Sequence, residues 1–241
     1  MSFKIAFGSC AQRTAVQVAW IRAVARNPDL ICIQGDTPYT GDSAASFRGY
    51  TTTACTISST VPQIFAAHQQ TWADPGFQAV TAFRQSGGVC FYMPDDHEWG
   101  GDNWDATLTR ANTAPSIGAS TQAEVDATSW VCVQAMQQAI AAYADNQTNT
   151  DPGVAAQKPS SADAGTSVSQ YPPLYFRSGF TFDGELLPYG ESGDVEVFTI
   201  SNVMHRSPIA ATDNASKTML GTTQKAWLKT WLLASTATWI S

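Results

Sequence analysis

Three turns of the chain carry side chains that could bind a metal ion or move a proton. Gly8-Ser9-Cys10 offers a thiol, Gly35-Asp36-Thr37-Pro38-Tyr39 a carboxylate and a phenol, and Pro94-Asp95-Asp96-His97-Glu98 three carboxylates and an imidazole. Each turn follows a short apolar segment that is typical of a β-strand. Taken singly, each has an ordinary structural interpretation: a tight turn, a solvated loop, a helix cap at Asp96, or a buried thiol at Cys10.

The apolar segments before these turns predict neighbouring strands of one sheet. Residues 3–7, 30–33 and 89–93 have strand patterns, and amphipathic helices are predicted at 15–25 and 77–84. This β-α-β order is typical of a parallel sheet that is buried on both faces. Because the crevice of such a sheet lies beyond the carboxyl ends of its strands, we expect the three turns to meet there. Anionic groups that crowd together need a compensating cation, so the sequence predicts a metal site.

The rest of the chain predicts a second sheet and further helices. We expect loop and helix between residues 40 and 74, and a surface loop insertion over residues 145–173, which are rich in turn formers. The other predicted elements are a helix at 130–143, strands at 174–182 and 195–200, a helix at 222–233 and a strand that begins at residue 238.

These motifs resemble the PhoD-like alkaline phosphatases, a branch of the calcineurin-like metallophosphoesterases. The resemblance rests on Phe7–Cys10, Pro28–Leu30, Gly35–Tyr39, Asp95–Glu98 and the segment Lys217–Leu228. It implies an α/β fold, the four-layer α-β-β-α metallophosphoesterase sandwich. The family's closing Gly-Asp-x-His block has no counterpart before the end of the sequence. We therefore expect residues 1–241 to form a catalytic domain whose C-terminal strands are missing.

The resemblance also implies a centre of two metal ions, proposed in the family to be Fe³⁺ and Ca²⁺. Carried over position by position, Cys10 and Tyr39 would bind iron, and Asp36 would bridge the two metals. Asp96 would bind the second metal, and Asn103 is a further candidate ligand because relatives carry asparagine in that loop.

The activity that the resemblance implies is hydrolysis of phosphate mono- or diesters by a metal-bound hydroxide. His97 would protonate the leaving oxygen, a task for a group that titrates near neutral pH. Of the family's Asp-x-Arg-x-x-Arg segment only the last arginine remains, Arg206, which would either contact the phosphate of a small substrate or form a surface salt bridge. For His68 and His205 we expect packing or surface roles.

Two other functions stay open at this point. The chain could be a degenerate, non-catalytic module that acts in binding or as a structural component of a larger assembly. A second chain or segment would then complete its sheet, because an open sheet edge invites pairing. Alternatively, the Cys10 thiol could be a nucleophile with His97 as its base.

Composition excludes some partners. Only 14% of the residues are charged and the net charge is −7, so a nucleic-acid or anionic-membrane surface is not expected. The longest apolar runs are too short for a membrane helix, and the first residues do not form a secretory signal. The PhoD-like family is mostly exported, but the sequence itself leaves the compartment open. Cys32 and Cys90 lie in apolar runs and are expected to be buried free thiols.

Overall fold

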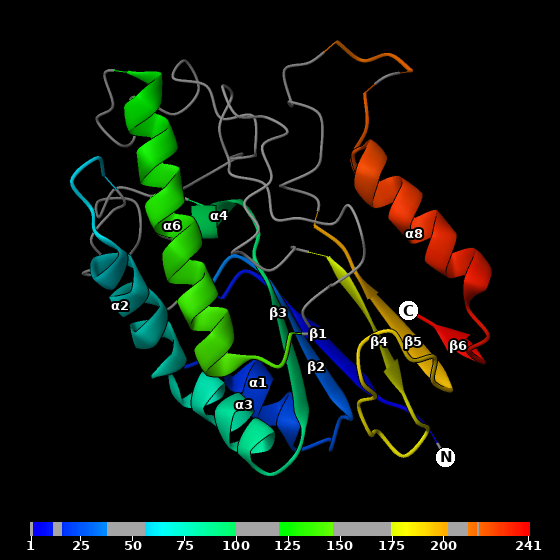
Figure 1. Cartoon of the computed structure of the whole chain (residues 1–241). Helices are drawn as coiled ribbons and strands as arrows, with labels where there is room; N and C mark the ends of the chain where they lie inside the picture. The colour runs from blue at the N-terminus through cyan, green and yellow to red at the C-terminus, as the bar shows by residue number, and fades with distance from the viewer. Residues whose placement is uncertain are drawn as a thin grey trace.

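The computed structural model describes residues 2–11, 16–37, 56–99, 121–146, 175–201, 212–215 and 217–241. In these ranges the chain is mixed α/β, with six helices and two three-stranded sheets (Figure 1). The expected α/β class is therefore confirmed. None of the helices in these ranges combines the length and the apolar character that crossing a membrane requires.

The first sheet and its helices come from the first 143 residues. The elements are β1 (Ile5–Gly8), α1 (Val18–Val24), β2 (Leu30–Gln34), α2 (Val61–Trp72), α3 (Pro75–Gln85), β3 (Val89–Met93), the short α4 (Asp96–Trp99) and α6 (Gln122–Tyr143). The second sheet and the last helix follow as β4 (Phe176–Phe180), β5 (Val195–Thr199), α8 (Thr222–Ala234) and β6 (Trp239–Ile240).

The first sheet has the order β1-β2-β3, and both strand pairs are parallel, as the sequence predicts. Leu30 pairs with Ile5 on one side and with Val89 on the other. All residues of β3 and the first four of β2 are buried. The apolar runs are continuous because both faces of these strands are covered.

The helices α1, α2, α3 and α6 cover one face of the first sheet (Figure 1). Aromatic side chains fill the space between these layers. Trp72 packs edge-on against Phe77, with 5.1 Å between ring centroids, and stacks on Tyr143 at 4.6 Å. The strand residues that face these helices are Ile31, Ile33, Cys90 and Tyr92.

The second sheet covers the other face of the first. Leu30, Cys32 and Phe91 from the first sheet pack against Phe176 and Phe180 of β4 and against the valines of β5. Within the second sheet, β4 and β5 are antiparallel, whereas β6 runs parallel to β5. The two sheets therefore pack against each other through a shared apolar layer.

Helix α8 packs on the outer side of the second sheet through aromatic and charged contacts. Trp227 lies edge-on to Tyr175 at 4.8 Å and to Phe198 at 6.1 Å between ring centroids. Beside it, Arg177 of β4 makes a 3.1 Å ion pair with Glu196 of β5. The Arg177 guanidinium also lies 3.7 Å from the ring centroid of Trp231 on α8.

The outer edge of β3 is paired by the residues that follow α6. Asp145 Oδ2 accepts from the Cys90 N–H at 3.0 Å, and Asp145 N–H donates back to the Cys90 carbonyl at 2.6 Å. The Asn146 amide bonds both the N–H and the carbonyl of Tyr92, at 2.8 and 2.7 Å. The first two residues of the predicted loop insertion 145–173 thus hydrogen-bond to the edge of β3 as a neighbouring strand would. Residues 147–173 lie outside the described ranges.

Two helices differ from the sequence-based expectation. The helix predicted at 130–143 begins earlier, at Gln122, because Thr121 and Glu124 form a reciprocal capping box at its start. The helix predicted at 15–25 spans only Val18–Val24. Between residues 40 and 74, helix α2 confirms the expected helical part, whereas residues 40–55 lie outside the described ranges.

Candidate metal centre

The turns after β1 and β2 lie side by side. The Cys10 N–H donates to the Gly35 carbonyl at 3.2 Å, and the Ala11 N–H donates to the Asp36 carbonyl at 3.2 Å. The parallel pairing of the strands continues in this way beyond their ends and brings Cys10 next to Asp36.

The turns after β2 and β3 are in direct contact at Gly35. A Cβ atom on Gly35 would lie 2.4 Å from the backbone nitrogen of Asp95 and 2.4 Å from its Cβ. Gly35 also has a φ of 75°, a backbone conformation that favours glycine. The absence of a side chain here is what lets the second and third turns approach each other.

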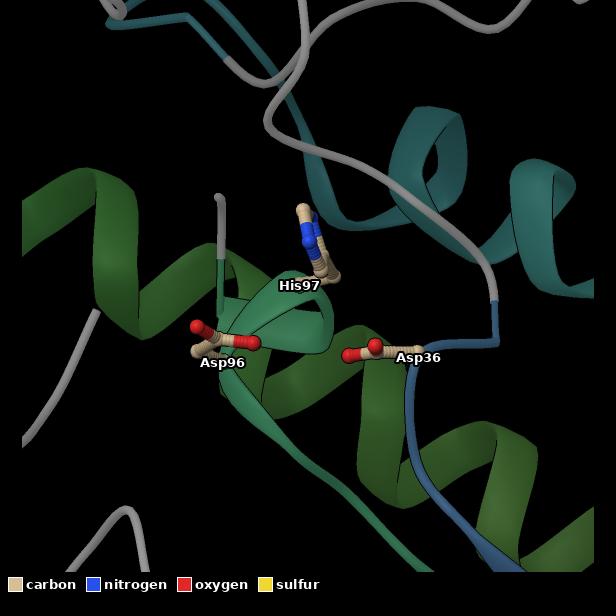
Figure 2. A group of neighbouring side chains, drawn as sticks. All are labelled: Asp36, Asp96 and His97. Atoms are coloured by element: carbon tan, nitrogen blue, oxygen red, sulfur yellow. The ribbon is translucent and has the colours of Figure 1, made fainter. Parts of the chain in front are cut away.

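Three candidate side chains converge where these turns meet. Asp36, Asp96 and His97 each offer a ligand atom, and these atoms all lie within 4.8 Å of one another. In Figure 2 the carboxylates of Asp36 and Asp96 face each other across a gap, with the His97 ring beside it. Both carboxylates are half-buried and His97 is buried. Two acids at this separation repel each other, and a cation between them would remove that repulsion.

The Cys10 thiol adjoins this cluster. Its Sγ lies 3.2 Å from Asp36 Oδ2, and the Ser9 hydroxyl lies 3.4 Å from the sulfur. Cys10 and Asp36 both have a φ of 57°, and Asn27 is the third non-glycine residue with positive φ in the described ranges. For a residue with a Cβ this conformation costs about 1–2 kcal/mol. Two candidate ligands held in strained backbone at one place is a pattern typical of functional sites.

Glu98 is the residue of this region to which sequence analysis gave no role. Its Oε2 accepts from the N–H groups of Asp36 at 3.0 Å and Asp95 at 2.8 Å, and its Oε1 accepts from the Thr37 N–H. Burial raises the pKa of the Glu98 carboxyl, whereas its hydrogen bonds with Thr37, Asp95 and Tyr92 lower the pKa and favour the carboxylate form. The spacing Asp95-x-x-Glu98 at the start of α4 resembles a capping box, which is the signal that could have identified it.

Tyr92 and His68 lie behind Glu98, between the first sheet and the helices that cover it. The Tyr92 O–H donates to Glu98 Oε1 at 3.0 Å and contacts the Thr37 carbonyl, and burial raises its pKa well above the usual value. His68 of α2 packs edge-on against Tyr92, with 6.3 Å between ring centroids. Burial lowers the pKa of His68 to about 3. The expected packing role of His68 is confirmed.

Three predicted site residues, Tyr39, Asn103 and Arg206, lie outside the described ranges, as does His205. The structure brings together Cys10, Asp36, Asp96 and His97 from the predicted set. Cys32 and Cys90 are buried free thiols, as expected.

A cavity of about 510 Å³ lies between the two sheets beside the cluster. Ser9 and Asp95, the chain neighbours of Cys10 and Asp96, form part of its wall. The wall mixes polar residues with apolar ones, among them Phe7, Phe91, Met93, Val197 and Phe198. Its volume falls in the range of small-molecule sites.

Comparisons of the chain with protein-family models, with curated proteins and with solved structures find no match in any of the three.

Proposed function

We propose that the chain is a PhoD-like metallophosphoesterase that hydrolyses small phosphate mono- or diesters at the centre built on Asp36 and Asp96. The observation that carries this proposal is the convergence of Asp36, Asp96 and His97 within 4.8 Å, from turns that are 60 residues apart in the sequence. The layer order of helices, sheet, sheet and α8 supports the α-β-β-α sandwich of that family as the finer fold assignment (Figure 1).

The donor set fits a transition metal. Two carboxylates and an imidazole lie together, and the Cys10 sulfur lies 3.2 Å from one of these carboxylates. Thiolate and imidazole donors favour iron, zinc or copper over magnesium, whereas carboxylates also suit calcium. We propose Fe³⁺ at Cys10 and Asp36 with Tyr39 as a further ligand, and Ca²⁺ at Asp36 and Asp96 with Asn103.

When bound, the metal ions supply Lewis acidity, which activates water and stabilises the charge on the phosphate oxygens. The chain's own residues then position the ester and move protons. His97 is buried beside the carboxylates and donates a proton to the departing oxygen of the ester. Arg206 pairs with the phosphate through its planar guanidinium. The cavity next to Ser9, whose wall includes Phe7, Phe91 and Val197, would receive the organic part of the substrate.

The first test measures metal content and turnover together. Purified protein is analysed for bound elements and assayed with bis(p-nitrophenyl) phosphate, before and after treatment with a chelator. We expect bound iron, turnover that is lost on chelation and turnover that returns when iron and calcium are restored. A well-folded chain that binds no metal and hydrolyses neither a diester nor a monoester would overturn the proposal.

A second test separates two roles that the position of His97 allows, proton donor and metal ligand. His97→Gln is compared with the wild type on a p-nitrophenyl ester, whose leaving group needs no proton, and on an alkyl ester, whose leaving group does. As a proton donor, His97 accounts for a loss of about 10²–10⁴-fold with the alkyl ester and a much smaller loss with the p-nitrophenyl ester. Equal losses with both esters, together with reduced metal content, would assign His97 to the metal instead.

The thiol of Cys10 is proposed as a ligand and not as a nucleophile. Its contact with the Asp36 carboxylate at 3.2 Å supports this choice, because a cation shared by the two groups would hold the sulfur as thiolate. Alkylation with iodoacetamide tests it: metal-loaded protein should react at Cys10 much more slowly than metal-free protein. Equal rates would contradict ligation.

A second candidate function is a non-catalytic module whose sheet is completed by another strand. It is favoured by the exposure of apolar residues on β6, where Trp239 is 65% and Ile240 is 48% exposed. Exposed apolar side chains on a short edge strand are typical of a surface that pairs with another segment or chain. The metal and turnover measurements discriminate the two candidates, because only the phosphoesterase requires a loaded centre.

A further inference from the structure

We propose that Glu98 is the positioning residue of the candidate metal centre: its carboxylate fixes the turn after β2 against the turn after β3, so that Asp36 and Asp96 face one cation. The inference rests on the proposed function. It adds a residue that supplies no ligand and touches no substrate, but on which the geometry of the ligands depends.

The hydrogen bonds of Glu98 reach both turns. One oxygen, Oε2, accepts from the N–H of Asp36 at 3.0 Å and from the N–H of Asp95 at 2.8 Å. The other oxygen, Oε1, accepts from the Thr37 N–H and from the Tyr92 hydroxyl at 3.0 Å. A single carboxylate therefore links the turn after β2, the turn after β3 and the body of β3.

The backbone around Asp36 is shaped to receive this carboxylate. Gly35 and Asp36 have φ angles of 75° and 57°, and the successive N–H groups of Asp36 and Thr37 both point at Glu98. Successive N–H groups in such a turn form a concavity that binds anions. Because the backbone of Asp36 is held by Glu98, its side chain is left to face Asp96, as Figure 2 shows.

Because Glu98 is buried, its hydrogen bonds cannot be replaced by water. Glu98 is completely buried, so each of its oxygens depends on protein donors. A glutamine of the same size has one accepting oxygen and one NH₂ group, and that NH₂ group would face backbone N–H groups that also donate. Glu98→Gln therefore weakens the hydrogen bonds that connect the two turns, without changing the volume of the side chain.

The experiment uses Co²⁺ as the probe, because its visible absorption reports both binding and ligand geometry. The 241-residue chain and its Glu98→Gln variant are stripped of metal and titrated with Co²⁺. We expect the variant to bind Co²⁺ about 10–100-fold more weakly and with an altered visible spectrum. The thermal midpoint and circular dichroism of the metal-free proteins verify that the variant is folded.

Two further variants complete the test. Glu185→Gln makes the same chemical change at an exposed position beside the second sheet and should leave Co²⁺ affinity and spectrum unchanged. Tyr92→Phe removes one donor to Glu98 and should weaken Co²⁺ binding by a smaller factor, which keeps the inference testable if Glu98→Gln does not fold.

The outcomes separate the inference from the function on which it rests. A wild-type chain that binds no Co²⁺ would overturn the metal centre and the positioning role with it. A wild-type chain that binds Co²⁺, with folded Glu98→Gln or Tyr92→Phe variants that bind it equally well and with the same spectrum, would overturn only the positioning role.

Discussion

The two sheets of this protein share an apolar layer but use their polar residues in different ways. In the first sheet all strand pairs are parallel, so the turns after its strands open at one edge, where Asp36, Asp96 and His97 converge. In the second sheet β4 and β5 are antiparallel, and their polar residues Arg177 and Glu196 pair with each other beneath α8. Parallel strands bring the turns that follow them to one edge, whereas the Arg177–Glu196 pair lies within the strands of the second sheet.

This comparison leads to an expectation: substitutions in the second sheet should affect stability, and substitutions at the edge of the first should affect metal binding and turnover. The largest effect is expected for Arg177→Met, which leaves the buried Glu196 carboxylate without its ion pair. We expect a loss of about 3–5 kcal/mol in the free energy of unfolding, measured by urea denaturation.

The control for Arg177→Met is the double variant with Glu196→Leu. Removing both charges leaves no unpaired buried ion, so it should be more stable than the single variant. Lys217→Met, at an ion pair whose partner Asp213 is exposed, should have no measurable effect. A single variant as stable as the wild type would show that the buried pair does not hold the second sheet.

The next largest effect is expected at the edge of the first sheet. Asp36→Asn removes a charge from the cluster and keeps the size of the side chain. We expect kcat/KM to fall by about 10²–10³-fold, with a change in the free energy of unfolding below about 1 kcal/mol. Asp183→Asn, at an exposed position between β4 and β5, is the matched control. Normal turnover by Asp36→Asn would remove Asp36 from the centre.

A smaller effect is expected for Cys10→Ser, which replaces a soft ligand by a hard one. The variant should bind iron about tenfold or more weakly than the wild type and lose much of the visible absorbance of the iron-loaded protein. Ser9→Ala removes the hydroxyl that lies 3.4 Å from the sulfur but keeps the thiol itself, and this variant should keep the absorbance. An unchanged spectrum for Cys10→Ser would contradict iron ligation by this residue.

The last expected effect concerns the helical side of the first sheet, and it is absent at neutral pH and grows only as the pH falls. His68 is buried with a pKa near 3, whereas in the unfolded chain its pKa is close to 6.5. Between these values the unfolded state binds the extra proton, so His68 lowers stability as the pH falls, by at most about 1.4 kcal/mol per pH unit.

His68→Leu removes this dependence. The free energy of unfolding of wild type and variant, measured from pH 7 down to pH 4, should diverge in favour of the variant as the pH falls. A difference between the two proteins that does not change with pH would mean that the pKa of His68 is the same in the folded and unfolded states.

The first sheet and its site could largely be predicted because their signals are local. The apolar runs ending at Ile33 and Met93 define buried parallel strands, and the position of such strands places the following turns together. The order of elements thus predicts that the turns carrying Asp36, Asp96 and His97 meet, whereas the choice of these side chains within the turns came from the family resemblance.

The role of Glu98 and the Arg177–Glu196 ion pair could not be predicted, because both depend on contacts between residues far apart in the sequence. The role of Glu98 depends on the N–H groups of Asp36 and Thr37, which are distant in the sequence. The pairing of Arg177 with Glu196 depends on the register of β4 and β5, which places them diagonally across the strand pair. Charged residues in strands are usually exposed, so the sequence around Arg177 does not indicate that its side chain is buried and paired.

The pairing of Asp145 and Asn146 with β3 has a consequence for how the protein can associate. Their hydrogen bonds occupy the N–H of Cys90 and both backbone polar groups of Tyr92, which an incoming strand would otherwise use. Before another polypeptide strand could pair with this edge of β3, or a fibril could grow from it, Asp145 and Asn146 would have to move away. Asn146→Ala would expose the N–H and the carbonyl of Tyr92, so that this part of the β3 edge could pair with another strand.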